Sequence, residues 1–198
     1  MMRSVRISAK ARVAGGMIRV AAALACATAA GGWTVTGTVV ETSHYLVSAR
    51  SHAEFVSAVR RAAPRSGTAF GHAIIDFFPT YLTMPAQGKG CRVGKVEVGL
   101  RIQLRVPKWR PASGTPKSVA RRGRHFERTI LAHEQHHVAI AKRFAVRMRT
   151  ALGKMKTDGD CWQLRREANE RIARLKKQHL AAQKAFDKRS YRQMKRLL

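Results

Sequence analysis

One apolar stripe, through residues 126–151, requires a long helix in this part of the chain. Its members recur at alternating steps of three and four residues, which is the spacing of a single helix face: Phe126, Ile130, His133, His137, Ala141, Phe144, Met148 and Ala151. An amphipathic helix turns such a face toward the protein core. The two histidines of the stripe are therefore predicted to point into the protein.

The same segment contains the pattern His-Glu-x-x-His. His133 and His137 are four residues apart, so a helix places both imidazoles on one face, close enough to share a metal ion. Zinc prefers imidazole nitrogen and tolerates an open coordination position, and Glu134 beside the first ligand is suited to act as a general base on metal-bound water. The alternative is a histidine-rich helix without metal. The cost of burying unpaired imidazoles favours the metal.

A second helix is expected to follow and to pack antiparallel to the first, because only a short connection separates them. Asp160 can cap it, and it carries its own apolar face: Leu164, Ala168, Ile172, Leu175, His179, Ala182 and Phe186. If the turn is centred near Lys156, His133 faces His179, and His137 faces Leu175. His179 is thus the expected third ligand of the metal.

Three alternatives for this third position stay open. His179 can instead be a hydrogen-bonded histidine of the core. Asp187 and Glu170 also offer carboxylate ligands, although each lies roughly 10 Å of helix rise from the ideal level.

The region before the helices predicts mainly strands. The clearest strand spans 96–106, where apolar and polar residues alternate strictly, as in an antiparallel strand with one solvated face. Other strands are expected over 33–40, 42–47 and 68–82, the last broken near Pro79, with one short helix that begins after Ser51. The expected fold class is α+β: an N-terminal antiparallel sheet with one short helix (33–107), packed with a C-terminal antiparallel long-helix hairpin (116–196) that carries the His-Glu-x-x-His motif. We expect residues 31–198 to form a single domain.

The chain is strongly basic. Its 39 Lys and Arg residues outnumber 11 Asp and Glu residues and give a formal charge of +28. Such a charge predicts attraction to anionic cell-envelope polymers or to a membrane surface. Nucleic acid is not an expected partner, because no recognised nucleic-acid motif is present and the protein is expected to be exported.

Residues 1–30 have the pattern of a signal peptide, with basic residues, a short apolar run and small residues in that order. The protein is therefore predicted to be secreted or periplasmic; Met17 is an alternative start, and Cys26 offers a weak lipoprotein site. Removal of the leader leaves two cysteines, Cys91 and Cys161. In an oxidising compartment these predict one disulfide, and the alternative is two unrelated buried thiols.

The order of these features resembles an uncharacterised bacterial family labelled predicted secreted Zn-dependent protease (domain of unknown function 922). The resemblance covers nearly all of the chain after the leader. It is carried by the following segments and residues: His44-Tyr45-Leu46-Val47, the strand containing Gly71, Cys91, Val106-Pro107-Lys108-Trp109, Leu131-Ala132-His133-Glu134-Gln135-His136-His137, Cys161 and Phe186-Asp187-Lys188-Arg189-Ser190.

The sequence departs from the family pattern near its end. The family continues with His-Gly where this chain has Arg192-Gln193. If that histidine is a ligand in the family, either His179 replaces it or this site has lost zinc. The resemblance implies an exported zinc metallohydrolase, a peptidase acting on a peptide or protein substrate. The alternative is a non-catalytic basic module that binds the cell envelope and retains the fold.

Overall fold

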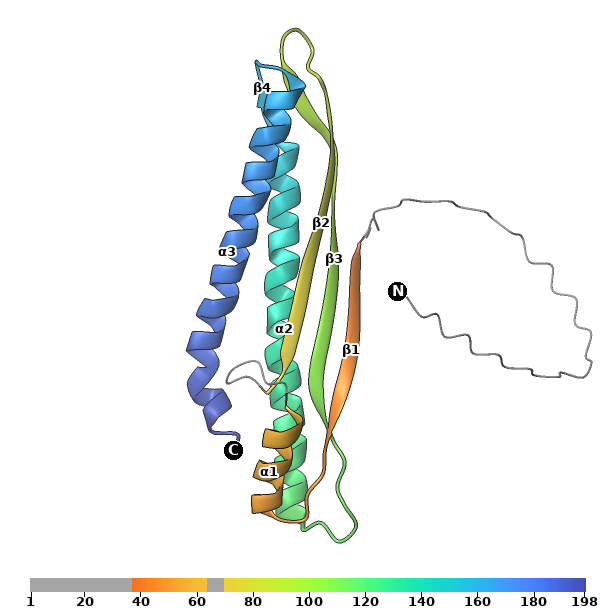
Figure 1. The fold of residues 1–198 in the computed structure, drawn as a ribbon, viewed down its shortest axis with the longest axis vertical. Helices are drawn as coiled ribbons and strands as arrows, with labels where there is room; N and C mark the ends of the chain where they lie inside the picture. The colour runs from red at the N-terminus through yellow and green to blue at the C-terminus, as the bar shows by residue number, and fades with distance from the viewer. Residues whose placement is uncertain (1–36, 64–69) are drawn as a thin grey trace, which may run out of the picture. The chain divides into compact units, whose positions relative to one another are not determined.

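The computed structural model describes residues 37–63 and 70–198. Its elements, in chain order, are β1 (Thr38–Val47), α1 (His52–Ala62), β2 (His72–Pro85), β3 (Cys91–Trp109), α2 (Lys117–Gly153), β4 (Lys156–Thr157) and α3 (Cys161–Lys195) (Figure 1). The chain is thus α+β, with its sheet formed mainly before two long helices. The predicted signal peptide, and the expected strand start at Trp33, lie outside the described residues.

The sheet is mixed, with the strand order β1-β3-β2 and with β4 paired to the first residues of β3. Strand β2 is antiparallel to β3, but β1 is parallel to it, so the expectation of a purely antiparallel sheet is wrong. The reason is that β3 enters between β1 and β2. These two strands run in opposite directions, so a strand that pairs with both must be parallel to one of them.

Strand β2 begins and ends later than expected and is not broken at Pro79, which pairs with Val98 inside the ladder. Proline is tolerated there because β2 is an edge strand, whose outer side needs no ladder hydrogen bond. The ladder shifts register later, between Tyr81 and Thr83. The turn into β3 contains Gly88 and Gly90, both with φ of 93°, a conformation that glycine adopts without steric cost.

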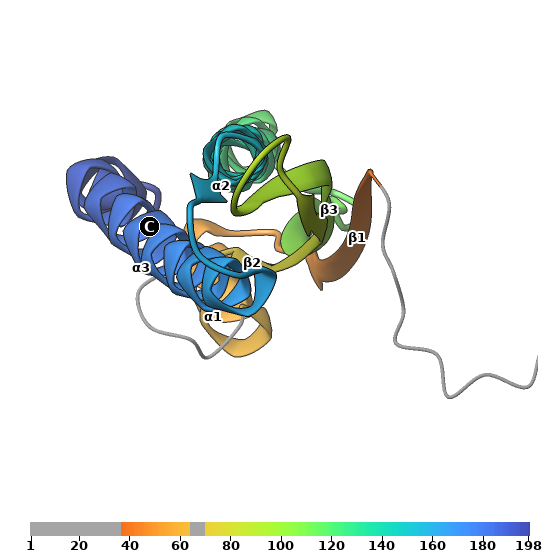
Figure 2. The same cartoon turned by 90° about the horizontal axis from the view of Figure 1, so that it is seen from above.

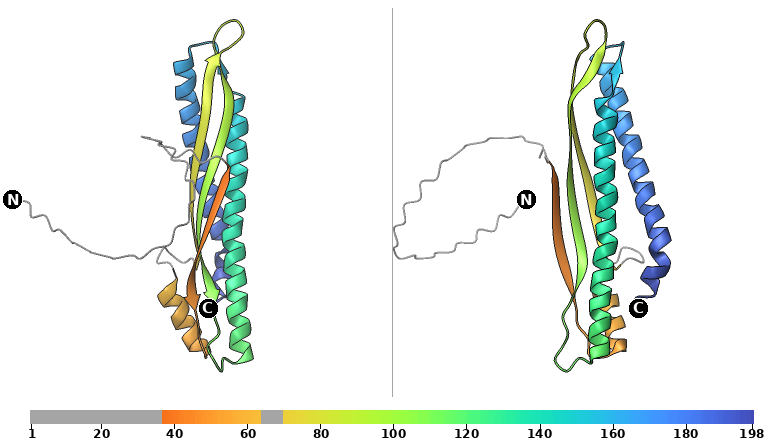
Figure 3. Two further views of the ribbon diagram at one scale, coloured as in Figure 1. Left: turned by 90° about the vertical axis from the view of Figure 1, so that its right-hand side faces the viewer. Right: turned by 180° about the vertical axis from the view of Figure 1, so that it is seen from behind.

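The predicted alternation in β3 is confirmed over residues 100–106, but not over residues 96–99, where Val96, Glu97 and Val98 are half-buried and Gly99 is buried. Leu100, Ile102, Leu104 and Val106 are buried, whereas Gln103 and Arg105 are exposed. The buried residues pack against α2, which runs along one face of the sheet (Figure 3). Met148 and Leu152 of α2 are fully buried in the same core cluster. The apolar stripe of α2 therefore packs on the apolar face of β3.

A second core cluster joins α1 to the first half of α2. The Phe55 ring makes edge contacts with Trp109 and Phe126. The expected cap of α1 is present, since the Glu54 amide donates to Ser51 Oγ at 3.2 Å. This cluster fixes the level of α2 relative to the strand ends.

Helix α3 runs back beside α2 and lies nearest β2 and farthest from β1 (Figure 2). Asp160 caps it as expected, accepting from the Gln163 amide at 2.7 Å. The predicted disulfide between Cys91 and Cys161 is present and ties the start of α3 to the start of β3. Among the described residues, no helix combines the length and apolar character needed to cross a bilayer.

The expected register of the helical hairpin is wrong. The His137 side chain meets Gln183, eight residues further along α3 than the expected Leu175. The connection between the helices includes β4, which pairs with Cys91 and Arg92 beyond the end of α2. Helix α3 therefore starts past the last turn of α2 (Figure 1), and residues further along α3 arrive at the level of the histidines.

Candidate metal centre

Helix α2 turns His133 and His137 inward, as the apolar stripe predicts. Each histidine is 8% exposed, and Glu134 beside them is 2% exposed. The helix is continuous through this segment, so the four-residue spacing brings both rings to one face. His136, which is not a member of the stripe, is exposed.

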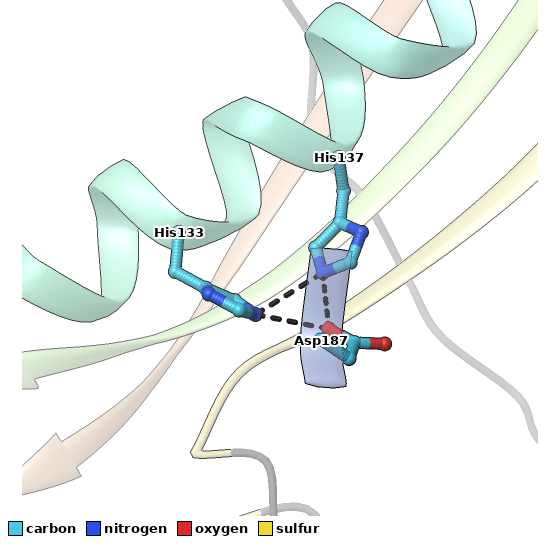
Figure 4. A group of neighbouring side chains, drawn as sticks. All are labelled: His133, His137 and Asp187. Atoms are coloured by element: carbon cyan, nitrogen blue, oxygen red, sulfur yellow. Dashed lines mark hydrogen bonds and ion pairs between the residues drawn. The ribbon is translucent and has the colours of Figure 1, made fainter. Parts of the chain in front are cut away.

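Asp187 of α3 completes a group of three potential ligands (Figure 4). Its Oδ1 lies 3.0 Å from His137 Nε2 and 3.3 Å from His133 Nε2, and the two Nε2 atoms are 3.1 Å apart. Donor atoms bound to one tetrahedral zinc ion at about 2.0–2.1 Å lie about 3.3 Å from each other. The triangle therefore has the size of one face of a metal coordination shell.

The positions of the protons on the two histidines are also compatible with a bound cation. Nδ1 of His137 lies 2.5 Å from the side-chain oxygen of Gln183, which can only accept, so this nitrogen carries the proton. With the proton on Nδ1, metal binding at Nε2 would use the lone pair of that nitrogen, which lies 3.0 Å from Asp187 Oδ1. A cation at the centre of the triangle would convert these mutually repelling acceptors into ligands. Burial, followed by the proximity of His137, lowers the pKa of His133, so this ring is also held in the neutral form that binds metals.

Gln183 orients the His137 ring from behind. Its amide nitrogen donates to the backbone carbonyl of His137 at 3.2 Å and to Nε2 of His179 at 2.7 Å. Metal-bound histidines commonly donate their second nitrogen to such a partner, which fixes the tautomer and the ring orientation. Gln183 and His179 thus form a hydrogen-bonded support for His137.

His179, the third ligand expected from the sequence, is not in the three-residue group. Its Nε2 accepts from Gln183, and its ring contacts Phe77 and Phe144. Glu170 is also outside the group; it is exposed and pairs with Arg174 at 3.7 Å. Asp187, one of the alternatives considered, is the residue that the structure brings to the two histidines.

Phe186 of α3 contacts the histidine rings of α2. Its ring stacks on His136 at 4.0 Å and on His133 at 4.7 Å. Because Phe186 and Asp187 are neighbours on α3, these stacking contacts also fix where the carboxylate of Asp187 lies. The aspartate side chain itself is 53% exposed.

Glu134 is enclosed by the start of β2. A Cβ added to Gly71 would lie 2.3 Å from Glu134 Oε1, so only glycine leaves room for this carboxylate. Burial, followed by the charge of Asp187, raises the pKa of Glu134 to about 7. A carboxyl group with this pKa can accept and return a proton near neutral pH.

One pocket of about 340 Å³ lies between β2, α2 and α3, and it is lined by the three potential ligands and Glu134. Its strand side is formed by Gly71, His72, Ala73 and Ile75, and its α3 side includes Leu180 and Gln183. A larger hollow of about 610 Å³ lies beside β1, but it contains one carboxylate, Glu97, and no histidine. The smaller pocket is therefore the one with the chemistry of a metal site.

Gly71 and Gln183 were not recognised as site residues from the sequence. Gln183 lies four residues after His179 and four before Asp187, so it shares their helix face. That spacing was the only available signal, because an amide side chain has no characteristic metal-site pattern.

Fold and site together define an α+β protein in which two buried histidines and one exposed carboxylate form a group that could hold a metal ion. Residues 42–193 match the model of a family described as bacterial protein of unknown function (DUF922), and the chain belongs to this family. No curated protein and no solved structure matches it.

Proposed function

We propose that this protein is an exported zinc-dependent hydrolase, a peptidase of the His-Glu-x-x-His type. The observation that carries the proposal is the convergence of His133, His137 and Asp187 beside buried Glu134 in one pocket. Two histidines and one carboxylate, with a position left open, form the ligand set of several catalytic zinc sites.

Zinc is favoured over iron, which also binds two histidines and one carboxylate. The distinguishing residue is Glu134, because a glutamate directly after the first ligand supplies the base that zinc hydrolases use. Iron oxygenases have no need of that base. The proposed ligands are thus His133, His137 and Asp187, with His179 supporting them through Gln183.

A bound zinc ion supplies Lewis acidity, which makes water nucleophilic near neutral pH. Glu134 would take up the proton at its side-chain oxygen and later return it to the leaving amine. Glu134 lines the same pocket as the three proposed ligands, which places its carboxylate within the site. The close approach of Gly71 keeps water away from one side of the carboxylate and fixes its position.

The proposed substrate is a peptide in an extended conformation. Strand β2 is an edge of the sheet and borders the pocket with His72, Ala73 and Ile75. Free backbone groups of an edge strand can bind an added peptide strand, which would pass its carbonyl groups over the pocket. Leu180, 59% exposed at the pocket, offers apolar contact to a substrate side chain.

The disulfide between Cys91 and Cys161 supports the proposed export, because disulfides persist in oxidising compartments. Cleavage after residue 30, release to the periplasm or medium, and anchoring at Cys26 remain predictions.

The test combines metal analysis with hydrolysis of a quenched fluorescent peptide library. The purified protein without residues 1–30 is expected to retain about one zinc per chain after dialysis. His137→Ala and Asp187→Ala should lose the zinc. Glu134→Gln should keep it and lose hydrolysis, so full activity of Glu134→Gln would remove the proposed mechanism.

The second candidate is a non-catalytic module that binds anionic polymers of the cell envelope. The excess of 39 basic over 11 acidic residues favours it, as does the departure from the family pattern at Arg192-Gln193. It predicts no stoichiometric metal after dialysis, and it predicts polymer binding that weakens as salt is added.

A further inference from the structure

Another hollow, separate from the two already described, has a volume of about 570 Å³ and lies between the start of α1 and the first turns of α2. In Figure 3, α1 lies beside this end of α2. The residues that line the hollow are His52, Ser118, Val119, Arg121, Arg122, His125 and Arg128. None of them lines the metal pocket. Along α2, the lining residues of the hollow begin about 22 Å of helix rise before His133 at Ser118 and end about 7.5 Å before it at Arg128.

The polar residues of the hollow follow from the helix period. Ser118, Arg121, His125 and Arg128 are spaced by three and four residues, so α2 presents them along one stripe. Arg122 is held next to this stripe. Its Nη2 donates to the Leu198 carbonyl at 2.9 Å, and its guanidinium lies 5.9 Å from the centre of the Phe55 ring.

The hollow is cationic and has no acidic counterpart. No Asp or Glu is among its lining residues. In the part of the chain that the structure describes, neither Arg121 nor Arg128 forms an ion pair with a carboxylate, whereas Arg122 donates to the oxygens of Leu197 and Leu198. Like charges on one face of a helix repel each other and destabilise the helix, and a bound anion between them would offset this repulsion.

From this arrangement we propose that the hollow binds a phosphate group. Guanidinium groups match phosphate oxygens with paired hydrogen bonds, which a compact concave site can supply from several directions. Ser118 and the two histidines add further donors. The phosphate can belong to a soluble phosphorylated compound or to a phospholipid headgroup, since both present the same oxygens.

Calorimetric titration with inorganic pyrophosphate tests the proposal on the purified protein. The double variant Arg121→Gln/Arg128→Gln removes two exposed guanidinium groups from the hollow. The matched control, Arg143→Gln/Arg171→Gln, removes the same charge from exposed positions elsewhere on α2 and α3. The hollow variant should weaken binding about tenfold or more, as expected from loss of charge-assisted hydrogen bonds. The control should change it by no more than about twofold.

A parallel measurement with phosphatidylglycerol vesicles, against phosphatidylcholine vesicles, separates the two sources of phosphate. Vesicle binding that is lost only in the hollow variant assigns the site to a lipid headgroup. Pyrophosphate binding without vesicle binding assigns it to a soluble compound. Equal weakening in both variants would show that net charge alone is responsible and would overturn the proposal. Absence of saturable binding to both probes would overturn it as well. Zinc content and thermal midpoint, expected to be unchanged in both variants, show that neither variant has unfolded.

Discussion

Replacing Gln183 by leucine should weaken zinc binding without removing any proposed ligand. Gln183 makes three hydrogen bonds at the site: it accepts from His137 Nδ1 at 2.5 Å, and it donates to His179 Nε2 at 2.7 Å and to the His137 carbonyl at 3.2 Å. Leucine has a similar volume but none of these bonds. The His137 ring would then be free to turn and to place its proton on Nε2, the nitrogen that faces Asp187.

The magnitude follows from the role of the lost bonds. Loss of a hydrogen bond that orients a metal-bound histidine typically costs a factor of about 10 to 100 in metal affinity. This corresponds to about 1.4 to 2.7 kcal/mol of binding free energy. Gln183→Glu keeps an acceptor for His137 Nδ1 but loses the two donated hydrogen bonds, so it should recover only part of the affinity. The assay is competition for zinc with a chromophoric chelator at fixed pH and ionic strength.

Gln178→Leu is the matched control, because Gln178 is exposed on the same helix and does not line the pocket. It should bind zinc as the unmodified protein does. If Gln183→Leu retains full affinity, Gln183 does not orient His137. An equal loss in Gln178→Leu would mean that the effect comes from α3 as a whole.

Three further predictions concern the surroundings of the site. Gly71→Ala places a methyl group within 2.3 Å of Glu134 Oε1 and should lower the free energy of unfolding, measured by urea titration, by about 1–3 kcal/mol. The control Gly153→Ala meets only an ordinary 4.0 Å contact and should not lower it. Replacing Cys91 and Cys161 by serine opens a link across 70 residues and should cost about 4 kcal/mol, measured against the unreduced protein; a loss below about 1 kcal/mol would contradict this. Removing zinc with a chelator should lower the thermal midpoint, since zinc at 100 times its dissociation constant stabilises by about 2.7 kcal/mol, and His137→Ala should be insensitive to the chelator.

The parts of the site that could be predicted are those that depend on neighbours along one helix. The inward direction of His133 and His137 follows from the period of α2, and both histidines are buried as that period requires. Glu134 is not on that stripe, and its burial comes from the close approach of Gly71. The disulfide followed from the count of cysteines left after the leader. The alternation of β3 likewise identified its buried face correctly.

The third member of the metal group could not be derived in this way. Whether His179 or Asp187 meets the histidines depends on how far α3 is displaced along α2. That displacement is fixed by pairings distant in sequence, namely those of β4 and Cys161 with the start of β3. The parallel pairing of β1 was missed for a similar reason, because β3 enters between two strands that precede it.

The sequence by itself determined the long helices, their apolar faces and the pair of inward histidines, because a helix repeats every 3.6 residues whatever surrounds it. Only the tertiary structure decided that Asp187 joins the histidines, that Gln183 supports them and that Gly71 encloses Glu134. These contacts connect elements far apart in the chain. Their partners are set by strand pairing and by the length of connections, which local periodicity does not contain.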